Sequence, residues 1–307
     1  MTVVAIVGPT AAGKSSLAIA LAERLGGEVV NADSMQLYRG MDIGTAKLAA
    51  SERRGVPHHV LDIWDVRDTA SVATYQTVAR AAVDDILTRG RVPLLVGGSG
   101  LYVRAALEHF KFPGTDPGLR DRLEAELAAA GPGALHTRLA AVDPAAAAKI
   151  LPSNGRRIVR ALEVIELTGA PFTAVLPDPA PAYPSVQVGV DLDTSVLDER
   201  IAARVRHMWS VGLADEVRAL IPLGLRDGRT ASRALGYQQM LAYVDGACTL
   251  DQAAADTIRA TRRFVRRQRT WFHRDPRIGW LDATSPDLLT SAEALIERGV
   301  RAATGGS

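Results

Sequence analysis

The sequence predicts an α/β protein in which a parallel sheet is flanked by helices and an all-helical segment is inserted into the chain. Short, continuously apolar runs alternate with helical periods over the first hundred residues. This alternation stops over about residues 112–184 and resumes with another apolar run at 186–192. Strands buried on both faces of a parallel sheet need such runs, and the helices between them cover the sheet.

The apolar run at residues 3–7 predicts the first strand, and the helical period of residues 16–25 ends at two glycines. Further strands are expected at 28–32, 60–63 and 93–96, with a helix over 71–89. In the inserted segment we expect helices at 117–130, 133–141, 143–149 and 153–168, followed by a proline-rich stretch that excludes helix. Beyond residue 197 the pattern predicts helices, including a long one over 253–273.

These patterns divide the chain into a core domain, residues 1–111 and 185–307, and a helical insertion domain, residues 112–184. The 307 residues are 47% hydrophobic and 23% charged, as is typical of globular proteins. A single cysteine excludes an intramolecular disulfide and a cysteine-based zinc site. Without a membrane-length apolar run or a signal-peptide pattern, we expect a cytoplasmic protein that does not engage a membrane.

A phosphate-binding loop follows the first strand. The motif G-x-x-x-x-G-K-[ST] is matched in full by Gly8, Pro9, Thr10, Ala11, Ala12, Gly13, Lys14 and Ser15. Backbone N–H groups of such a loop converge on phosphate oxygens, while Lys14 neutralises charge and Ser15 holds Mg²⁺. The core is therefore predicted to be P-loop NTPase-like. The strand at 93–96 ends in glycines, however, and the competing acid Asp191 lies beyond the insertion, which weakens an ATPase interpretation.

Asp33 follows the second predicted strand, at the sheet edge where ligands of parallel sheets bind. A carboxylate there could accept a proton from a nucleophile, help to hold Mg²⁺, or cap a helix or turn. Spacing alone leaves these alternatives open.

The second chemical feature is a concentration of positive charge near the C-terminus. Eight arginines and one acid, Asp275, lie between Arg259 and Arg277. Several of these arginines share one face of the predicted long helix. That face is either a solvated surface or a site for a polyanion.

Five segments of the chain resemble one known family, the tRNA dimethylallyltransferases, beyond the phosphate loop that they also share. They are residues 31–47, 97–102, 156–164, 232–239 and 266–272, in the order that the family shows. The resemblance implies transfer of the dimethylallyl group from dimethylallyl diphosphate to the N6 amine of the adenosine 3′ of the tRNA anticodon, with release of diphosphate. Eukaryotic members carry a zinc finger, which one cysteine cannot form, so the resemblance is to the bacterial type.

The resemblance also implies roles for individual residues. The phosphate loop would hold the diphosphate with Mg²⁺ bridging, Arg204 would reach the same group, and Asp33 would be the general base. Ser99 stands where many members have threonine, close to the reacting adenine. Contacts to the tRNA anticodon stem-loop are implied for Asp33, Ser34, Met35, Gln36, Ser99, Arg120, Arg156, Arg157, Ile158, Val159, Arg160, Arg233, Ala234, Leu235, Gly236, Tyr237, Gln238, Arg266, Arg267, Gln268, Arg269, Thr270, Trp271, Phe272 and His273.

Two other functions would explain part of the combination of phosphate loop, Asp33 and arginine-rich helix. A P-loop kinase or an adenylate isopentenyltransferase acting on a free nucleotide would need the phosphate loop and Asp33 but not the arginine-rich helix. A non-catalytic, nucleotide-dependent RNA-binding module would need the helix but no base. No obligate protein partner is expected.

Overall fold

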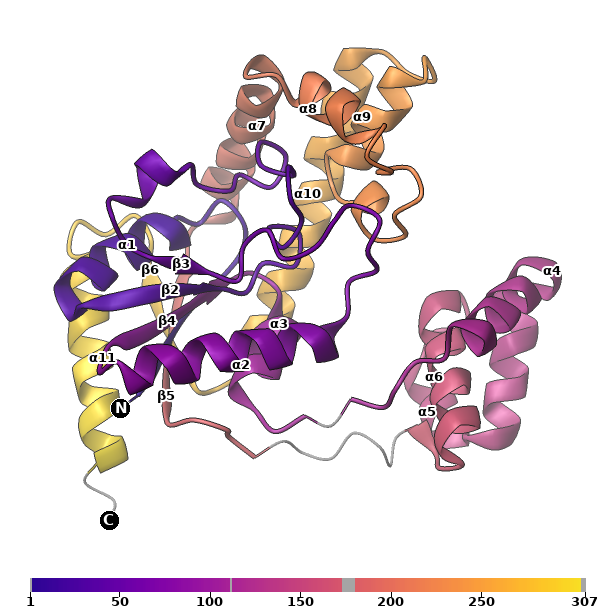
Figure 1. Ribbon diagram of the computed structural model, residues 1–307, viewed down its shortest axis with the longest axis horizontal. Helices are drawn as coiled ribbons and strands as arrows, with labels where there is room; N and C mark the ends of the chain where they lie inside the picture. Colours follow the sequence, from indigo (N-terminus) through magenta and orange to yellow (C-terminus); the bar gives the residue numbers. More distant parts are fainter. Residues whose placement is uncertain (1, 111, 173–179, 305–307) are drawn as a thin grey trace. The chain divides into compact units, whose positions relative to one another are not determined.

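A computed structural model of the chain describes residues 2–110, 112–172 and 180–304. The chain forms two compact units, which we call the core unit (residues 1–107 and 182–307) and the helical unit (residues 108–181). Figure 1 shows the elements of both. The domain boundaries expected from the sequence, 112 and 184, lie a few residues from these limits.

The core unit is built on a parallel sheet whose described strands have the order β3-β2-β4-β1-β5-β6. The strand that leads into the phosphate loop, β1, pairs with β4 on one side and β5 on the other. The loop therefore leaves from the middle of the sheet. The strands are β1 Val3–Val7, β2 Gly27–Asn31, β3 His58–His59, β4 Val92–Gly97, β5 Ser185–Asp191 and β6 Ile278–Asp282.

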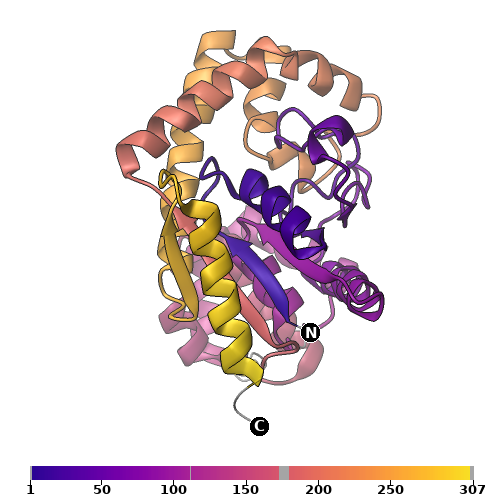
Figure 2. The same cartoon turned by 90° about the vertical axis from the view of Figure 1, so that its left-hand side faces the viewer.

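Helices cover this sheet and bury its apolar side chains. The α1 helix packs on β2 and β4 and lies beside α11, while α2 packs on α3 and on the same two strands (Figure 2). Helices α7 to α10 pack on one another. The helices are α1 Lys14–Leu25, α2 Val72–Thr88, α3 Gly100–Leu107, α7 Thr194–Ser210, α8 Leu213–Leu220, α9 Tyr237–Val244, α10 Leu250–Phe272 and α11 Leu288–Thr304.

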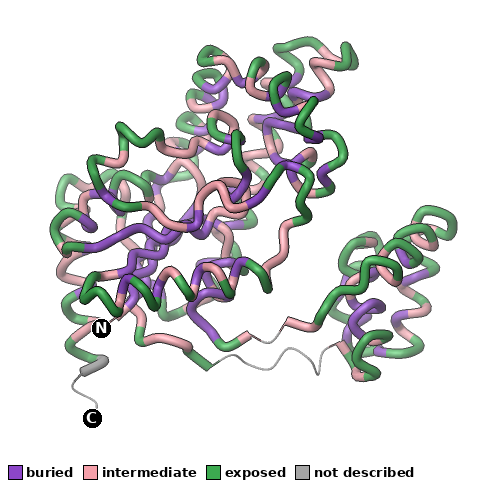
Figure 3. The backbone as a smooth tube through the Cα atoms, viewed as in Figure 1, coloured by how far each residue is buried: buried purple, intermediate pink, exposed green. Residues whose placement is uncertain are grey.

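Burial is concentrated on the sheet, as Figure 3 shows. Ile6, Leu94 and Val188, from three neighbouring strands, are completely buried and belong to one apolar cluster with Leu21 of α1. The predicted fold class, a P-loop NTPase-like parallel sheet with flanking helices, is confirmed.

One strand prediction was wrong, and one strand was not predicted. Residues 60–63 are not a strand, because Val60 (φ 62°) and Asp62 (φ 56°) are left-handed and cannot continue an extended backbone; β3 is limited to two residues before them. The edge strand β6, which pairs with β5, was missed. Its five residues include a glycine and follow a proline, so the apolar run there is too short to predict a strand.

The helical unit has three described helices and its own apolar cluster, which includes Leu123, Leu139, Ile158 and Leu162. The helices are α4 Pro117–Val142, α5 Pro144–Lys149 and α6 Gly155–Thr168. Gly131, with φ 78°, interrupts α4 where the sequence predicts two helices. Most of the predicted proline-rich stretch, residues 173–179, lies outside the described residues. Over the described part of the chain, no helix is long and apolar enough to cross a membrane.

Candidate functional site

The loop Gly8–Ser15 turns sharply between β1 and α1, and two glycines make this turn possible. Gly13, the N-terminal cap of α1, has φ 93°, which side chains disfavour. A Cβ at Gly8 would lie 2.2 Å from the carbonyl oxygen of Val190 on β5. The loop is thus held tightly against the sheet at the N-terminus of α1, where backbone N–H groups favour anions.

A cavity of about 360 Å³ opens beside this loop. Its walls come from the loop, from the residues that follow β2, from the end of β4 and from α7. The polar side chains among them include Lys14, Ser15, Asp33, Gln36 and Arg204. The structure therefore brings three of the predicted diphosphate and base residues, Lys14, Asp33 and Arg204, to one cavity.

Burial changes the acidity of two of the basic side chains that line this cavity, Lys14 and Arg204; Arg200 lines it as well. Desolvation lowers the pKa of Lys14 from its ordinary value to about 8; nearby Asp33 opposes this shift and Arg204 adds to it. Burial likewise lowers the pKa of Arg204, again against the influence of Asp33. Among the described residues that line the cavity, Asp33 is the one carboxylate. The site carries excess positive charge and is suited to a polyanion.

Main-chain and hydroxyl oxygens hold the cations in place. The Lys14 ammonium donates to the Pro9 carbonyl oxygen at 2.7 Å. The Arg204 guanidinium donates to the Thr10 hydroxyl at 3.4 Å and to the Thr45 carbonyl oxygen at 3.3 Å. Because these partners are uncharged, both cations keep their charge available for a ligand.

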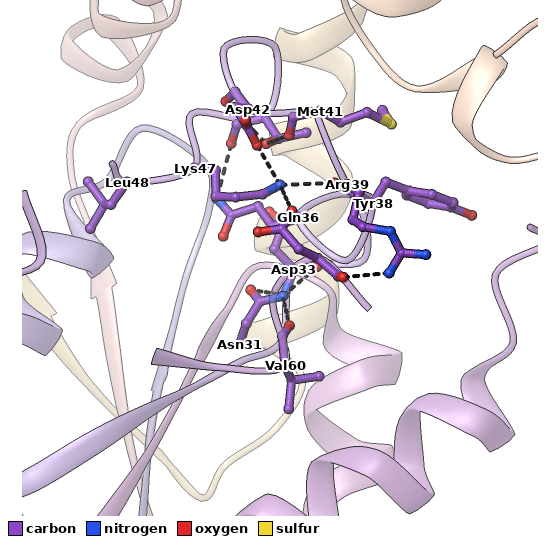
Figure 4. Close-up of polar contacts among 12 residues, drawn as sticks. Asn31, Asp33, Gln36, Tyr38, Arg39, Met41, Asp42, Lys47, Leu48 and Val60 are labelled. Carbon is purple, nitrogen blue, oxygen red and sulfur yellow. Dashed lines mark hydrogen bonds and ion pairs between the residues drawn. The ribbon is translucent and has the colours of Figure 1, made fainter. Parts of the chain in front are cut away.

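The Asp33 carboxylate is presented by a turn that Asn31 organises (Figure 4). The Asn31 amide oxygen accepts from the Asp33 backbone N–H at 2.9 Å, and its NH₂ donates to the carbonyl oxygens of Asp33 and Val60 at 3.0 and 3.1 Å. One Asp33 carboxylate oxygen accepts from the Met35 N–H at 2.9 Å. Asn31 was not among the predicted site residues; the sequence signal for it is an asparagine at the end of a strand, two residues before an acid.

Ser99 reaches this turn from the end of β4. Its hydroxyl lies 3.3 Å from the Ser34 hydroxyl and accepts from the Ser34 backbone N–H at 3.5 Å. Close packing makes this possible, because a Cβ at Gly97 would lie 2.3 Å from the Ala32 carbonyl oxygen. Asp33 and Ser99, predicted to serve the same reaction, lie on adjoining turns.

The segment after Asp33 is also fixed by buried polar contacts. Lys47, whose side chain is only 3% exposed, donates to the Tyr38 carbonyl oxygen and pairs with Asp42 and Asp62 (Figure 4). Glu216 of α8 accepts from the backbone N–H groups of residues 42–44. Neither Lys47 nor Glu216 was among the predicted site residues, since their partners lie on turns that the spacing of residues in the sequence does not reveal.

The predicted tRNA contacts fall into exposed and buried sets. Exposed side chains are those of Arg156, Arg157, Arg233, Gln238, Arg266, Arg267, Thr270, Trp271 and His273. Partly exposed are Ser34, Met35, Gln36, Arg120, Arg160, Leu235 and Arg269. The side chains of Ile158, Val159, Ala234, Tyr237, Gln268 and Phe272, and the backbone of Gly236, are buried. Ile158, Val159, Gln268 and Phe272 lie on the core-facing stripe of the amphipathic helices α6 and α10. For the whole buried set, direct contact with tRNA stays a prediction.

Several of the arginines predicted to bind tRNA are already paired. Arg269 donates to Asp191 and Thr194, and His273 also lies 3.1 Å from Asp191. Arg120 and Arg160 both pair with Glu163, whose side chain is fully buried. Asp191, the acid considered for an ATPase, is therefore held by α10 and does not line the cavity.

A basic surface remains on the outer face of α10. Arg266, Arg267, Thr270, Trp271 and Arg274 line a shallow cavity of about 290 Å³. The Trp271 side chain is 45% exposed and packs against Gly100, where a Cβ would lie 2.0 Å from the indole nitrogen. An aromatic ring among arginines is suited to unpaired nucleobases and phosphates.

The donor groups for a metal are few. Within the described residues, no group of three or more histidine, cysteine, aspartate or glutamate side chains could hold a metal ion. Ser15 and Asp33, both oxygen donors, line the cavity with Lys14. Mg²⁺ is commonly held by one or two protein oxygens together with phosphate oxygens and water, and these residues fit that mode.

A phosphate loop at the centre of a parallel sheet, with a cation-rich cavity beside it, defines a P-loop protein that binds a phosphorylated ligand. Residues 36–275 match the family model described as IPP transferase. A "tRNA dimethylallyltransferase" of Salinispora arenicola is 73% identical over 98% of this chain and 87% of the relative; that of Streptomyces coelicolor is 66% identical over 98% and 97%. The chain belongs to this family of IPP transferases, the tRNA dimethylallyltransferases.

Solved structures agree with this assignment. The full-length tRNA isopentenylpyrophosphate transferase of Bacillus halodurans is 41% identical, with a TM-score of 0.72 over 99% of each chain. A eukaryotic dimethylallyltransferase acting on tRNA is 26% identical, with a TM-score of 0.82 over 98% of this chain and 80% of the other.

Proposed function

We propose that this protein transfers the dimethylallyl group from dimethylallyl diphosphate to the N6 amine of the adenosine 3′ of a tRNA anticodon. The observation that carries the proposal is the cavity in which Lys14 and Arg204 stand beside Asp33, with the Ser99 turn adjoining. Lys14 and Arg204 suit a leaving diphosphate, whereas Asp33 and the Ser99 hydroxyl suit an attacking amine. Family membership supports the reaction, and the positions of these side chains support the roles proposed for them below.

Leaving-group stabilisation falls to the phosphate loop. As the bond between the allylic carbon and oxygen breaks, its electron pair goes to the diphosphate, whose growing charge faces the Lys14 ammonium, the Arg204 guanidinium and the loop N–H groups. Groups fixed before the reaction stabilise such charge without reorganisation. Ser15 would hold Mg²⁺, which would supply further charge neutralisation for the leaving diphosphate when bound.

On the acceptor side, the amine forms the new C–N bond and gives up a proton to the Asp33 carboxylate. The turn built by Asn31 holds this carboxylate without any ion-pair partner among the described residues, so it is available as a base. The Ser99 hydroxyl is placed to hydrogen-bond the adenine. The base has to leave its stack to reach this turn, as substrates of base-modifying enzymes do.

Docking of the anticodon stem-loop is assigned to the outer face of α10. Arg266, Arg267 and Arg274 supply positive charge for phosphates, and Trp271 supplies an exposed ring. The proposal places the enzyme in the cytoplasm with its tRNA substrate, without an obligate protein partner.

The test is an acceptor assay with labelled dimethylallyl diphosphate and either unmodified tRNA or AMP. We expect label in tRNA alone, and its loss when a chelator removes Mg²⁺. Label in AMP would point to a free-nucleotide isopentenyltransferase. No label in either acceptor, with tRNA still bound, would favour an RNA-binding module and overturn the proposal.

A further inference from the structure

One buried side chain, that of Gln268, hydrogen-bonds to both the phosphate loop and the turn that follows β4. Gln268 lies on α10, is 7% exposed, and uses both ends of its amide. Its oxygen accepts from the Thr10 backbone N–H at 3.0 Å, and its NH₂ donates to the Gly98 carbonyl oxygen at 2.8 Å. Gln268 thus bridges the phosphate loop and the turn at the end of β4.

The surroundings are shaped for this amide. A Cβ at Gly98 would lie 2.4 Å from the Gln268 amide nitrogen, so the β4 turn closes directly on it. An uncharged amide supplies one acceptor and two donors, which is what an N–H on one side and a carbonyl on the other require. A hydrocarbon of the same length would leave the buried Gly98 carbonyl oxygen and the partly buried Thr10 N–H without these partners, at a cost in stability.

The two bridged positions belong to opposite sides of the reaction. Thr10 carries the hydroxyl to which Arg204 donates, on the diphosphate side. Gly98 immediately precedes Ser99, whose hydroxyl meets the Ser34 turn on the acceptor side. We therefore expect a change in the Gln268 bridge to alter the separation between the phosphate loop and the turn that carries Ser99.

The helix that carries Gln268 is firmly seated. Val265 and Phe272, on the same inner face of α10, are buried, and Arg269 is tied to Asp191 at the end of β5. Arg266 and Arg267 point to solvent on the outer face. Changing Gln268 should therefore leave the proposed docking surface in place.

We propose that Gln268 is a positioning residue, which holds the phosphate loop and the Gly97–Gly100 turn at the spacing that prenyl transfer needs. This inference rests on the proposed function for its kinetic consequence. It assigns Gln268, which the sequence analysis had among the tRNA contacts, to the geometry of the reaction. A misplacement of about 1 Å between reacting groups can cost about 10² in rate.

The test compares Q268M, which keeps size and removes both hydrogen bonds, with T257V. Thr257 is another buried polar residue of α10, and its hydroxyl bonds to its own helix. We expect Q268M to lower the single-turnover rate about 10²-fold and to weaken binding of inorganic pyrophosphate, with the Kd for tRNA within about twofold of wild type. T257V should keep the wild-type rate.

A second variant, Q268E, gives a pH readout that simple loss of packing would not produce. The protonated carboxyl group has one donor and one acceptor and can replace the amide, whereas the ionised form can only accept. The ratio of variant to wild-type rate should therefore rise as the pH falls. The ionisable side chains that line the adjoining cavity, Lys14, Asp33, His58, Arg200 and Arg204, are common to both proteins, so their titration largely cancels in this ratio.

Wild-type rates in folded Q268M, or equal losses in Q268M and T257V, would overturn the inference. If Q268M does not fold, a pH-independent Q268E ratio would overturn it. If wild type transfers no prenyl group, the proposed function fails instead, and pyrophosphate binding still decides: unchanged affinity in Q268M would show that Gln268 does not position the loop.

Discussion

In each unit, two basic side chains lie near one acid: Arg120 and Arg160 near Glu163 in the helical unit, and Lys14 and Arg204 near Asp33 in the core unit. The two pairs differ in what they bond to. In the helical unit, Arg120 and Arg160 bond directly to Glu163, and these bonds lower the pKa of that carboxyl despite its burial. In the core unit, Lys14 and Arg204 bond to uncharged oxygens, and burial lowers the pKa of both.

This difference separates structural charge from functional charge. A desolvated cation without a bonded anion costs free energy, which the binding of an anionic ligand recovers. A cation already bonded to a buried carboxylate has little left to offer a ligand, and it stabilises the fold instead. Perturbed, unpaired cations around a cavity therefore mark the ligand site.

The largest expected effect follows from removing the buried ammonium. Lys14→Met should lower kcat/KM for dimethylallyl diphosphate by about 10³ or more, because a charge aimed at the leaving group is removed. Steady-state kinetics measures this. Lys149→Met, which removes an exposed lysine of α5, is the matched control and should behave as wild type. A decrease below tenfold in Lys14→Met would contradict the assignment of Lys14 to the diphosphate.

Next in size is the loss of the base. Asp33→Asn keeps an oxygen for the Met35 N–H but cannot take up the proton, so the single-turnover rate should fall by about 10² or more. The Kd for tRNA should stay nearly constant. Asp65→Asn, at an exposed acid outside the cavity, serves as control. A near-normal rate in Asp33→Asn would remove Asp33 from the role of base.

These first two variants test residues that the sequence could identify. The motif located Lys14, and the position of Asp33 after an apolar strand placed it at the binding edge of the sheet. Both inferences use local sequence alone, because strand, turn and helix follow one another directly. The fold class was predictable for the same reason.

Long-range pairing was not predictable. Nothing in the sequence distinguishes Arg269, bonded to Asp191, from Arg266, which is exposed three residues earlier. Burial of Gln268 against Thr10 joins residues 258 positions apart. The strand expected at 60–63 failed because two left-handed residues redirect the chain, and apolar composition carries no information about that.

A third prediction concerns the docking surface. The double variant Arg266→Glu, Arg267→Glu should weaken tRNA binding and reduce the slope of log K against log salt by about 0.7–0.9 for each phosphate that the protein no longer neutralises. Arg269 is left intact, since reversing it would release Asp191. Arg218→Glu on α8 is the control for added negative charge. Filter binding over a salt series gives the slopes, and equal slopes in both variants would make this face an ordinary solvated surface.

A smaller effect is expected from pH. Free Lys14 has a pKa of about 8, and a bound diphosphate favours its charged form and raises that pKa. The Lys14 contribution to pyrophosphate affinity should therefore be constant well below pH 8 and should fall as the pH rises through 8. Calorimetry across this range measures it. Lys14→Arg, which stays charged, should remove this component, and an unchanged profile in that variant would assign it to another group.

The smallest effect on RNA binding is expected in the helical unit. There a paired arginine, Arg120, can be compared with an unpaired one, Arg156. Arg120→Met removes a partner of buried Glu163 and should lower the stability of this unit by about 1.5–3 kcal/mol, the usual contribution of hydrogen bonds to charged groups. Its tRNA salt slope should not change.

Arg156→Glu should change tRNA binding but not stability, because Arg156 is exposed and has no ion pair within the described part of the chain. It should reduce the salt slope by no more than about 0.9 and leave stability within about 0.5 kcal/mol. The helical unit contains no tryptophan, so hydrogen exchange in α6 peptides is the suitable measure of its stability. A reduced salt slope in Arg120→Met, with protection of α6 intact, would mean that a paired arginine still serves the RNA, and the distinction between structural and functional cations would not hold in this unit.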